Sequence, residues 1–268
     1  MTNAPVFDHI SYSSISLFQA CPLRFYFRYI LGLPEDVVSA SLVFGSALHR
    51  SVQYHFEQLL AGNGPPDLDT LLGVYQDSWR DRFWQNNIKF NKGENIDTLG
   101  LLADRMLRVF QKSDFASPKG VILGIEEEFR AEIVPGCPDL LARIDLVVDT
   151  GDELLVSDFK TSRSTWTADH IGESSSQLLL YSELVKELAE GRKIRLEFAV
   201  LTKAKLPEMI RNPVPFNSAQ VERTKKVVAN VWRAIQTGNF YPYVVKDVMW
   251  RNLRTSQACQ PCGLRCAT

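Results

Sequence analysis

The sequence lacks a long apolar run. No segment approaches the ~18 consecutive apolar residues that a membrane-spanning helix needs, and the start, MTNAPVFDHI, lacks the basic and apolar regions of a signal peptide. We therefore expect no membrane partner and a cytoplasmic location. Of the 268 residues, 45% are hydrophobic and 23% are charged, so the chain can bury the core of one large domain or two coupled ones.

The chain also has little net charge and few cysteines. Its formal net charge is -1, so the overall charge gives no sign of a nucleic-acid partner, although a local basic groove can coexist with a neutral total. In a reducing compartment the five cysteines are better suited to metal binding or packing than to disulfides. Composition alone therefore leaves the function open.

The pattern of the sequence changes once along the chain. From Ser13 to about Asp114 it predicts helices, one of them starting at Pro22, with loops at 61–69 and Asn91–Asn95. After Ser117 it predicts an α/β core with strands at 121–134, 140–150, 153–161 and 194–202 and helices near Glu173–Ala189 and Ser218–Gln236. We therefore expect a mixed central β-sheet flanked by helices.

The segment ARIDLVVDTGDELLVSDFKTS, residues 142–162, has the most informative local pattern. Gly151 and Asp152 suit a two-residue hairpin turn. A turn there would place Asp145 opposite Asp158 on the neighbouring strand, where two carboxylates repel each other. An interaction that offsets this repulsion is therefore expected.

Alternation along the second strand puts Lys160 on the same face as Asp158. A divalent cation that bridges the two carboxylates would offset their repulsion, and oxygen ligands suit Mg²⁺ or Mn²⁺. Such an ion can activate water and stabilise charge on a phosphate, while Lys160 would orient the water or neutralise the transition state. The alternative is an ordinary surface hairpin whose charged side chains face water.

Two helical segments offer further polar side chains. His49 shares its helix face with apolar residues, so it is either a core histidine or a ligand that would favour Mn²⁺. Gln177 and Tyr181 are four residues apart on one face of a helix that closely follows the Lys160 strand. The alternative for this pair is a polar first turn with a half-buried tyrosine.

The cysteines are spaced for a cluster site. Cys259, Cys262 and Cys266 form a C-x2-C-x3-C pattern, and Cys21 between the first two predicted helices is the candidate fourth ligand. Zinc and an iron–sulfur cluster both satisfy this stoichiometry. The alternative is a flexible tail with free thiols.

Taken in order, these motifs resemble those of the RecB-type branch of the PD-(D/E)xK nucleases, which includes Cas4 and the AddB nuclease domain. The resemblance extends through nearly the whole chain, over ISYSSISLFQACPLRFYFRYI, FGSALHR, RIDLV, SDFKT, QLLLY and the terminal cysteines. It implies a restriction-endonuclease-like core over 117–250. It also implies a helical N-terminal part over 1–116, which contributes Cys21 and His49, and a cysteine-rich tail over 251–268.

The resemblance also implies roles for individual residues. Lys160 would be catalytic, and Gln177 and Tyr181 would contact DNA or the reacting phosphate. The implied ligands of the metal ion are His49, Asp145, Asp158 and the backbone carbonyl of Phe159, and those of a [4Fe–4S] cluster are Cys21, Cys259, Cys262 and Cys266.

The expected function is hydrolysis of DNA phosphodiester bonds with Mg²⁺ or Mn²⁺. By analogy with the family, we expect an exonuclease that prefers single-stranded DNA or DNA ends and acts in end processing, recombination repair or CRISPR adaptation. A helicase or Cas1–Cas2-type proteins are the candidate partners. Two alternatives stay open, a catalytically weak DNA-binding or scaffold module of such an assembly and a zinc-stapled interaction protein.

Overall fold

The structure of the chain is a computed structural model that describes residues 7–34, 37–85 and 87–241. The chain forms two compact units that interleave along the sequence. Of the described residues, unit 1 contains 7–34, 131–141 and 225–241, and unit 2 contains 37–85, 87–130 and 142–224. None of the helices among the described residues combines the length and the hydropathy needed to cross a bilayer.

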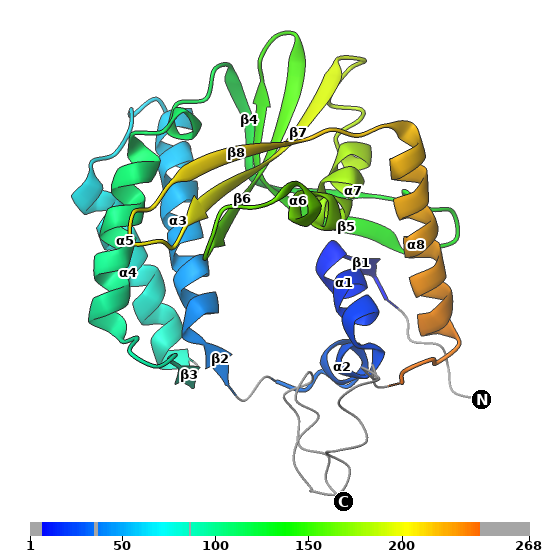
Figure 1. Cartoon of the computed structure of the whole chain (residues 1–268). Coiled ribbons are helices and arrows are strands. Elements are labelled where there is room, and N and C mark those ends of the chain that lie inside the picture. Colours follow the sequence, from blue (N-terminus) through cyan, green and yellow to red (C-terminus); the bar gives the residue numbers. More distant parts are fainter. Residues whose placement is uncertain (1–6, 35–36, 86, 242–268) are drawn as a thin grey trace, which may run out of the picture. The chain divides into compact units, whose positions relative to one another are not determined.

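A mixed β-sheet forms the centre of unit 2 (Figure 1). β5 pairs antiparallel with β6, β6 pairs parallel with β7, β7 pairs antiparallel with β8, and β4 pairs with β5. The strands are β4 (Val121–Ala131), β5 (Asp139–Asp149), β6 (Glu153–Ser162), β7 (Lys193–Thr202) and β8 (Met209–Val214). A mixed sheet flanked by helices is the predicted fold class, which the structure confirms.

The hairpin between β5 and β6 has the predicted turn and register. The Thr150 N–H donates to the Glu153 carbonyl, so Gly151 and Asp152 form the two-residue loop. Gly151 has a φ of 90°, and a positive φ at the first loop position is what a type II′ turn requires. This turn pairs Leu146 with Ser157, which makes Asp145 and Asp158 the next residues along the two strands.

Helices α3 (Ala40–Leu60), α4 (Leu68–Gln85) and α5 (Ile96–Gln111) pack beside the sheet in unit 2. Their apolar side chains recur every three or four residues and form one buried cluster with one face of the sheet. Phe44, Phe56 and Phe110 are almost completely buried in it, and each contributes about 1.5–3 kcal/mol through burial. The sheet residues in this cluster are Leu146, Val148, Leu155, Phe159, Ala199 and Leu201.

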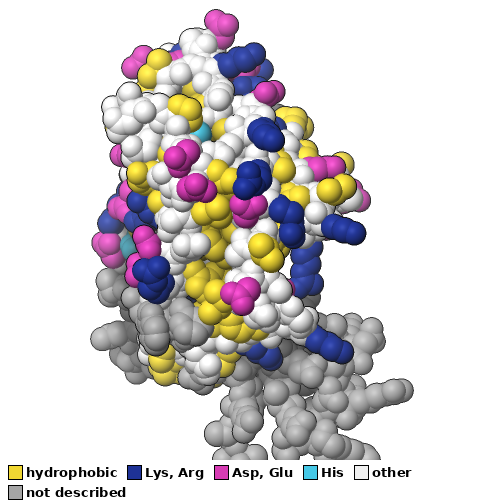
Figure 2. Space-filling view, turned by 90° about the vertical axis from the view of Figure 1, so that its left-hand side faces the viewer, with side chains coloured by type: hydrophobic (Ala, Val, Ile, Leu, Met, Phe, Trp, Pro, Cys, Tyr) yellow, Lys and Arg dark blue, Asp and Glu magenta, His cyan; other side chains and the backbone are white. Residues whose placement is uncertain are grey.

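The outer surface beside these helices carries mixed charges. Figure 2 shows Lys and Arg side chains interspersed with Asp and Glu, and a band of hydrophobic side chains between them. This mixture agrees with a net charge of -1 for the whole chain. Attraction of an anionic ligand must therefore come from a local arrangement of side chains.

Two helices, α6 (Ala168–Ser174) and α7 (Ser176–Leu184), connect β6 to β7. Leu178 and Val185 pack with Val156 and Phe198 in a second buried cluster. The sequence predicted one helix over Glu173–Ala189, and the structure corrects this prediction. The Ser175 hydroxyl donates to the Gly172 carbonyl, and this side-chain hydrogen bond competes with continuation of the helix. The first of the two helices, α6, starts before Glu173 because Thr167 caps it.

Unit 1 holds the N-terminal elements β1 (His9–Ile10), α1 (Tyr12–Ala20), α2 (Pro22–Phe25) and the π-helix η1 (Tyr26–Ile30). β1 pairs parallel with the first residues of β5. Ser11 caps α1 through a capping box, and Pro22 starts α2 as predicted. Phe25 is 1% exposed and contacts the rings of Phe18 and Phe240, so this aromatic residue serves packing.

Several short strands were not predicted. β2 (Val38–Ser39), β3 (Ile88–Lys89) and β1 have two residues each, too few for an alternating pattern. β8 contains Pro213, which disfavours a strand but is tolerated here because β8 is the last strand in the sheet order. The last helix, α8 (Ser218–Gln236), has the predicted bounds and runs from unit 2 into unit 1.

Gly120, which precedes β4, provides a test of this packing. A Cβ atom there would lie 2.1 Å from the Asp149 carbonyl oxygen, and the φ of 133° disfavours any side chain. We expect Gly120→Ala to lower the free energy of unfolding by about 3 kcal/mol, measured by urea denaturation. The control Gly62→Ala, at a φ of 76° with no atom within 4 Å, should lose only about 1 kcal/mol. Equal losses would contradict the close approach of β4 to β5.

Candidate active site

Side chains from five elements of unit 2 converge on one groove of about 640 Å³. They come from α3, β4, β5, β6 and α7, and α4 adds Ser78 and Arg82 at the edge. All of the predicted site residues outside the cysteines line this groove, namely His49, Asp145, Asp158, Phe159, Lys160, Gln177 and Tyr181.

Asp145 lies where the β5–β6 ladder ends. The last pair that β5 and β6 form is Leu146 with Ser157. At the next position the Asp145 carboxylate, rather than a backbone carbonyl, accepts the N–H of Phe159 at 2.7 Å. This hydrogen bond holds the Asp145 carboxylate between the two strands and leaves its other lone pairs for a ligand.

Asp158 is the most buried acid of the group, with 1% of its surface exposed. Its Oδ1 accepts a hydrogen bond from Gln177 Nε2 at 2.9 Å. Its Oδ2 lies 2.7 Å from Lys160 Nζ but accepts no well-aligned hydrogen bond. Burial and then the charge of Asp145 raise the pKa of Asp158, and the nearby Lys160 only partly opposes them. A further positive charge beside Asp158 would therefore stabilise its ionised form.

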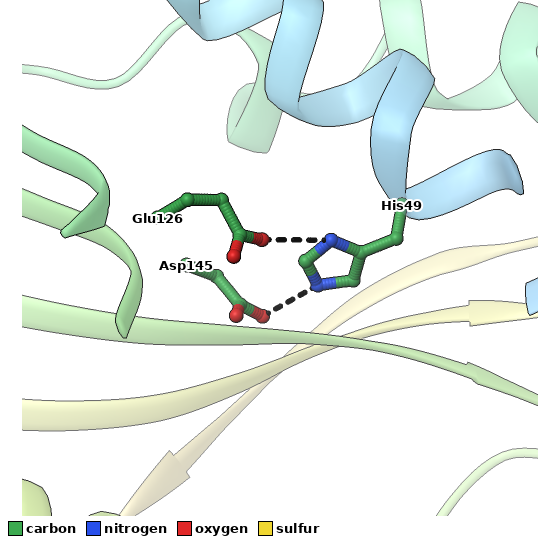
Figure 3. Close-up of side chains that lie close together, drawn as sticks. All are labelled: His49, Glu126 and Asp145. Carbon is green, nitrogen blue, oxygen red and sulfur yellow. Dashed lines mark hydrogen bonds and ion pairs between the residues drawn. The ribbon is translucent and has the colours of Figure 1, made fainter. Parts of the chain in front are cut away.

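The ring of His49, from α3, lies between the carboxylates of Glu126 and Asp145 (Figure 3). Its Nε2 lies 2.9 Å from Asp145 Oδ2, and its Nδ1 lies 2.9 Å from Glu126 Oε1. Burial by itself lowers the pKa of His49, but the two carboxylates outweigh it and raise the pKa to about 10. The position between Glu126 and Asp145 therefore favours positive charge.

Glu126 is the site residue that the sequence analysis missed. It belongs to the run GIEEEF in β4, where three consecutive glutamates hide which of them faces inward. Its φ of 51° is unusual for a residue other than glycine and interrupts the alternation of the strand. The only signal in the sequence is that three glutamates in a row cannot all follow the two-residue period of a strand.

Gln177 and Tyr181 lie on one face of α7, as their spacing predicted. Gln177 Nε2 donates to the Tyr181 hydroxyl at 2.7 Å and to Asp158. Tyr181 is 6% exposed, and burial followed by the charge of Asp158 raises its pKa, so the phenol stays protonated. Gln177 therefore positions the Asp158 carboxylate, and Tyr181 accepts a hydrogen bond from Gln177.

The donor atoms fit a divalent cation. The closest group is His49, Glu126 and Asp145, whose ligand atoms all lie within 4.8 Å of one another. Carboxylate oxygens and an imidazole nitrogen suit Mg²⁺ or Mn²⁺. The buried Oδ2 of Asp158, which lacks an aligned hydrogen bond, is a further candidate ligand in the same groove.

The predicted cysteine site is only partly within the described residues. Cys21 lies in unit 1 at the C-cap of α1, with 4% of its surface exposed. Cys259, Cys262 and Cys266 lie outside the described residues. The four-cysteine ligand set therefore stays a prediction.

Cationic side chains line the groove although the chain as a whole is almost neutral. Arg143 is largely exposed, and Arg50 forms an ion pair with Glu57 at 3.0 Å beside the groove. The cations of the groove are Arg50, Arg82, Arg143, Lys160 and Lys203. They surround the acidic centre and give the groove the mixed charge that a phosphate backbone and a cation together would match.

The chain matches a known family in its sequence and a solved structure in its fold. The model of the PD-(D/E)XK nuclease superfamily matches residues 9–267. A crystal structure from Eubacterium rectale, of a protein named for an inferred exonuclease activity, is 15% identical with a TM-score of 0.57, and the match covers 88% of this chain and 84% of that one. At this identity the likeness shows the fold alone. The crystal structure of SSO0001 matches 81% of this chain and 84% of its own at 16% identity, with a TM-score of 0.29. No curated protein matches the chain significantly.

Metal titration tests the place of Glu126 in the site. We expect Glu126→Gln to weaken Mn²⁺ binding by about tenfold or more, because the amide keeps the shape of the side chain but removes one negative charge from the ligands. Isothermal titration of the metal-free chain measures this change. Glu127→Gln, a neighbouring exposed residue, is the matched control and should bind like the wild type. Equal affinity in the two variants would remove Glu126 from the site.

Proposed function

Because the chain belongs to the PD-(D/E)XK nuclease superfamily, we propose that it is a divalent-metal-dependent DNA nuclease that hydrolyses phosphodiester bonds. One observation supports this proposal above the others. The buried Asp158 lies beside Asp145 and His49 in a groove, with the Lys160 ammonium 2.7 Å from its carboxylate. Two acids, an imidazole and a lysine at one point form a donor set suited to a metal ion and a phosphate.

We propose His49, Asp145, Asp158 and the Phe159 backbone carbonyl as ligands of Mg²⁺ or Mn²⁺, with Glu126 as an additional ligand. When bound, the ion would lower the pKa of water and stabilise negative charge on the phosphate. To act as a ligand, His49 must lose the proton of the ring nitrogen that binds the metal ion. The carboxylates of Asp145 and Asp158 are held independently of the protonation of His49. The Phe159 N–H holds Asp145, and Gln177 holds Asp158.

Lys160 is the proposed catalytic cation. Its Nζ lies 2.7 Å from the Asp158 carboxylate, so it would contact a water molecule that is bound next to this carboxylate. About a third of the Lys160 side chain is exposed. A fixed ammonium at this point would orient the water and stabilise the charge that develops on the phosphate. Gln177 and Tyr181 would contact DNA or the reacting phosphate, and Gln177 also positions Asp158.

The proposed substrate is DNA with single-stranded segments or free ends, cut by exonuclease action. The cationic side chains of the groove support a phosphate backbone as the ligand. The family resemblance is the basis for placing the enzyme in end processing, recombination repair or CRISPR adaptation, with a helicase or Cas1–Cas2-type proteins as partners.

The proposed role of the cysteines is structural. Cys21 would hold a [4Fe–4S] cluster together with Cys259, Cys262 and Cys266, and zinc is the less favoured occupant. The burial of Cys21 at the junction of α1 and α2 gives a thiolate ligand a fixed position in unit 1. Such a cluster would tie the N-terminal helices to the C-terminal tail.

A cleavage assay tests the catalytic assignment. We expect Asp158→Asn to lower kcat by about 10³-fold on a labelled single-stranded oligonucleotide with Mn²⁺, because the variant loses a charge at the metal and Lys160. The control Asp152→Asn makes the same chemical change at an exposed residue of the hairpin tip, and this variant should cleave like the wild type. Equal rates in all three proteins would show that the nuclease activity, if any, lies elsewhere.

Spectroscopy tests the cysteine assignment. The chain purified without oxygen should be brown and absorb broadly near ~400 nm, as thiolate-bound iron–sulfur clusters do. Cys21→Ser should lose this absorbance, and Cys137→Ser, a half-buried cysteine outside the proposed ligand set, should keep it. A colourless wild type that contains zinc would overturn the iron–sulfur assignment.

A further inference from the structure

A second lysine, Lys203, lines the same groove at the end of β7. Its backbone N–H donates to the Ser162 carbonyl at 2.6 Å, which holds it beside the end of β6. Its Nζ lies 5.2 Å from the centre of the buried Phe44 ring and 3.4 Å from the Ser41 carbonyl oxygen. The ring and the carbonyl fix the ammonium against α3 and leave its remaining donors facing the groove.

The positive charge of Lys203 has no neutralising partner among the described residues. No carboxylate among the residues that the structure describes forms an ion pair with it. Burial and then the charge of Arg163 lower the pKa of Lys203, and the charge of Glu94 only partly offsets them. An ammonium held half-buried without an anion costs stability that an apolar side chain on Phe44 would avoid. This cost is accounted for if a ligand supplies the anion.

The sheet places Lys203 at a defined separation from the catalytic lysine. β6 and β7 run parallel, with Lys160 paired to Val200 and Ser162 paired to Thr202. Lys203 therefore lies three residues beyond the partner of Lys160 on the adjacent strand, at roughly 11 Å between the backbones from the usual spacings of a sheet. An extended nucleic-acid strand covers this separation in about one or two nucleotides.

Small residues of α3 line the groove on the side of Lys203. Gly45 lies so close to β6 that a Cβ atom there would be 3.2 Å from Thr161 Oγ1. Ser41 and Ser46 line the groove on the same helix, and the Ser41 carbonyl oxygen contacts the ammonium. A phosphate in this part of the groove would meet one cation and two hydroxyl donors, without a carboxylate in an ion pair with that cation.

We propose that Lys203, with Ser41 and Ser46, forms a second phosphate-binding position, which holds a backbone phosphate one or two linkages away from the bond that is cut. This inference rests on the proposed nuclease function and adds to it a positioning residue that does not touch the reacting phosphate. A lysine binds phosphate as a point charge and contacts no base, so the position binds DNA without sequence preference. It fixes the register of the strand relative to Lys160.

Kinetics of the full chain test the proposal. Lys203→Met keeps an apolar stem on Phe44 but removes the charge, so it should fold like the wild type. With Mn²⁺ and a labelled single strand, we expect KM to rise about tenfold and to change more than kcat. The slope of log(kcat/KM) against log[KCl] should become shallower by about 0.7, the effect of one lost phosphate contact. Lys203→Arg should restore most of the affinity, and Lys205→Ala, an exposed lysine two residues away, should change neither constant.

Neutral linkages locate the contact. A methylphosphonate placed one or two linkages from the cut should slow the wild type, and the same linkage should have no further effect on Lys203→Met. If Lys203→Met behaves like Lys205→Ala, or stays as sensitive to the neutral linkages as the wild type, the second phosphate position is wrong. A wild type that cleaves no DNA while binding Mn²⁺ would instead refute the proposed nuclease function.

Discussion

The burial of the Asp158 carboxylate beside Asp145 is the constraint on which the rest of the site depends. A carboxylate buried beside a second acid stays ionised only if positive charge lies next to it. The protein supplies part of that charge through Lys160 and His49, which approach from β6 and from α3. A divalent cation would supply the remainder, so the same repulsion that costs stability creates a site with affinity for metal.

The fold makes this arrangement possible through two irregularities in the sheet. β5 and β6 are paired up to Leu146 and Ser157, and beyond this pair the Asp145 side chain takes the place of a ladder partner for Phe159. A second irregularity, the positive φ of Glu126 in β4, brings another carboxylate to His49. Both depart from regular β-structure at the point where function is proposed, while the two buried clusters on either side of the sheet supply the stability.

Much of the fold was predictable because its elements have clear periods. The Gly151–Asp152 turn determined the hairpin register, and the four-residue spacing of Gln177 and Tyr181 placed both side chains on one helix face. The prediction of one continuous helix over Glu173–Ala189 was wrong because a single hydroxyl bond at Ser175 interrupts a pattern that is otherwise helical. The two-residue strands and β8 were missed because short segments, or segments with proline, show no alternation.

The sequence by itself determined the nuclease superfamily, the mixed α/β class and the hairpin register that brings Asp145 close to Asp158, because these depend on neighbours in the chain and on two periodicities. Only the tertiary structure decided which of three consecutive glutamates meets His49, and that Lys203 lies on Phe44 in the same groove as Lys160. These contacts join residues far apart in sequence. Their formation depends on how helices pack on the sheet and on a local change of backbone angle, and neither leaves a periodic signal in the amino-acid order.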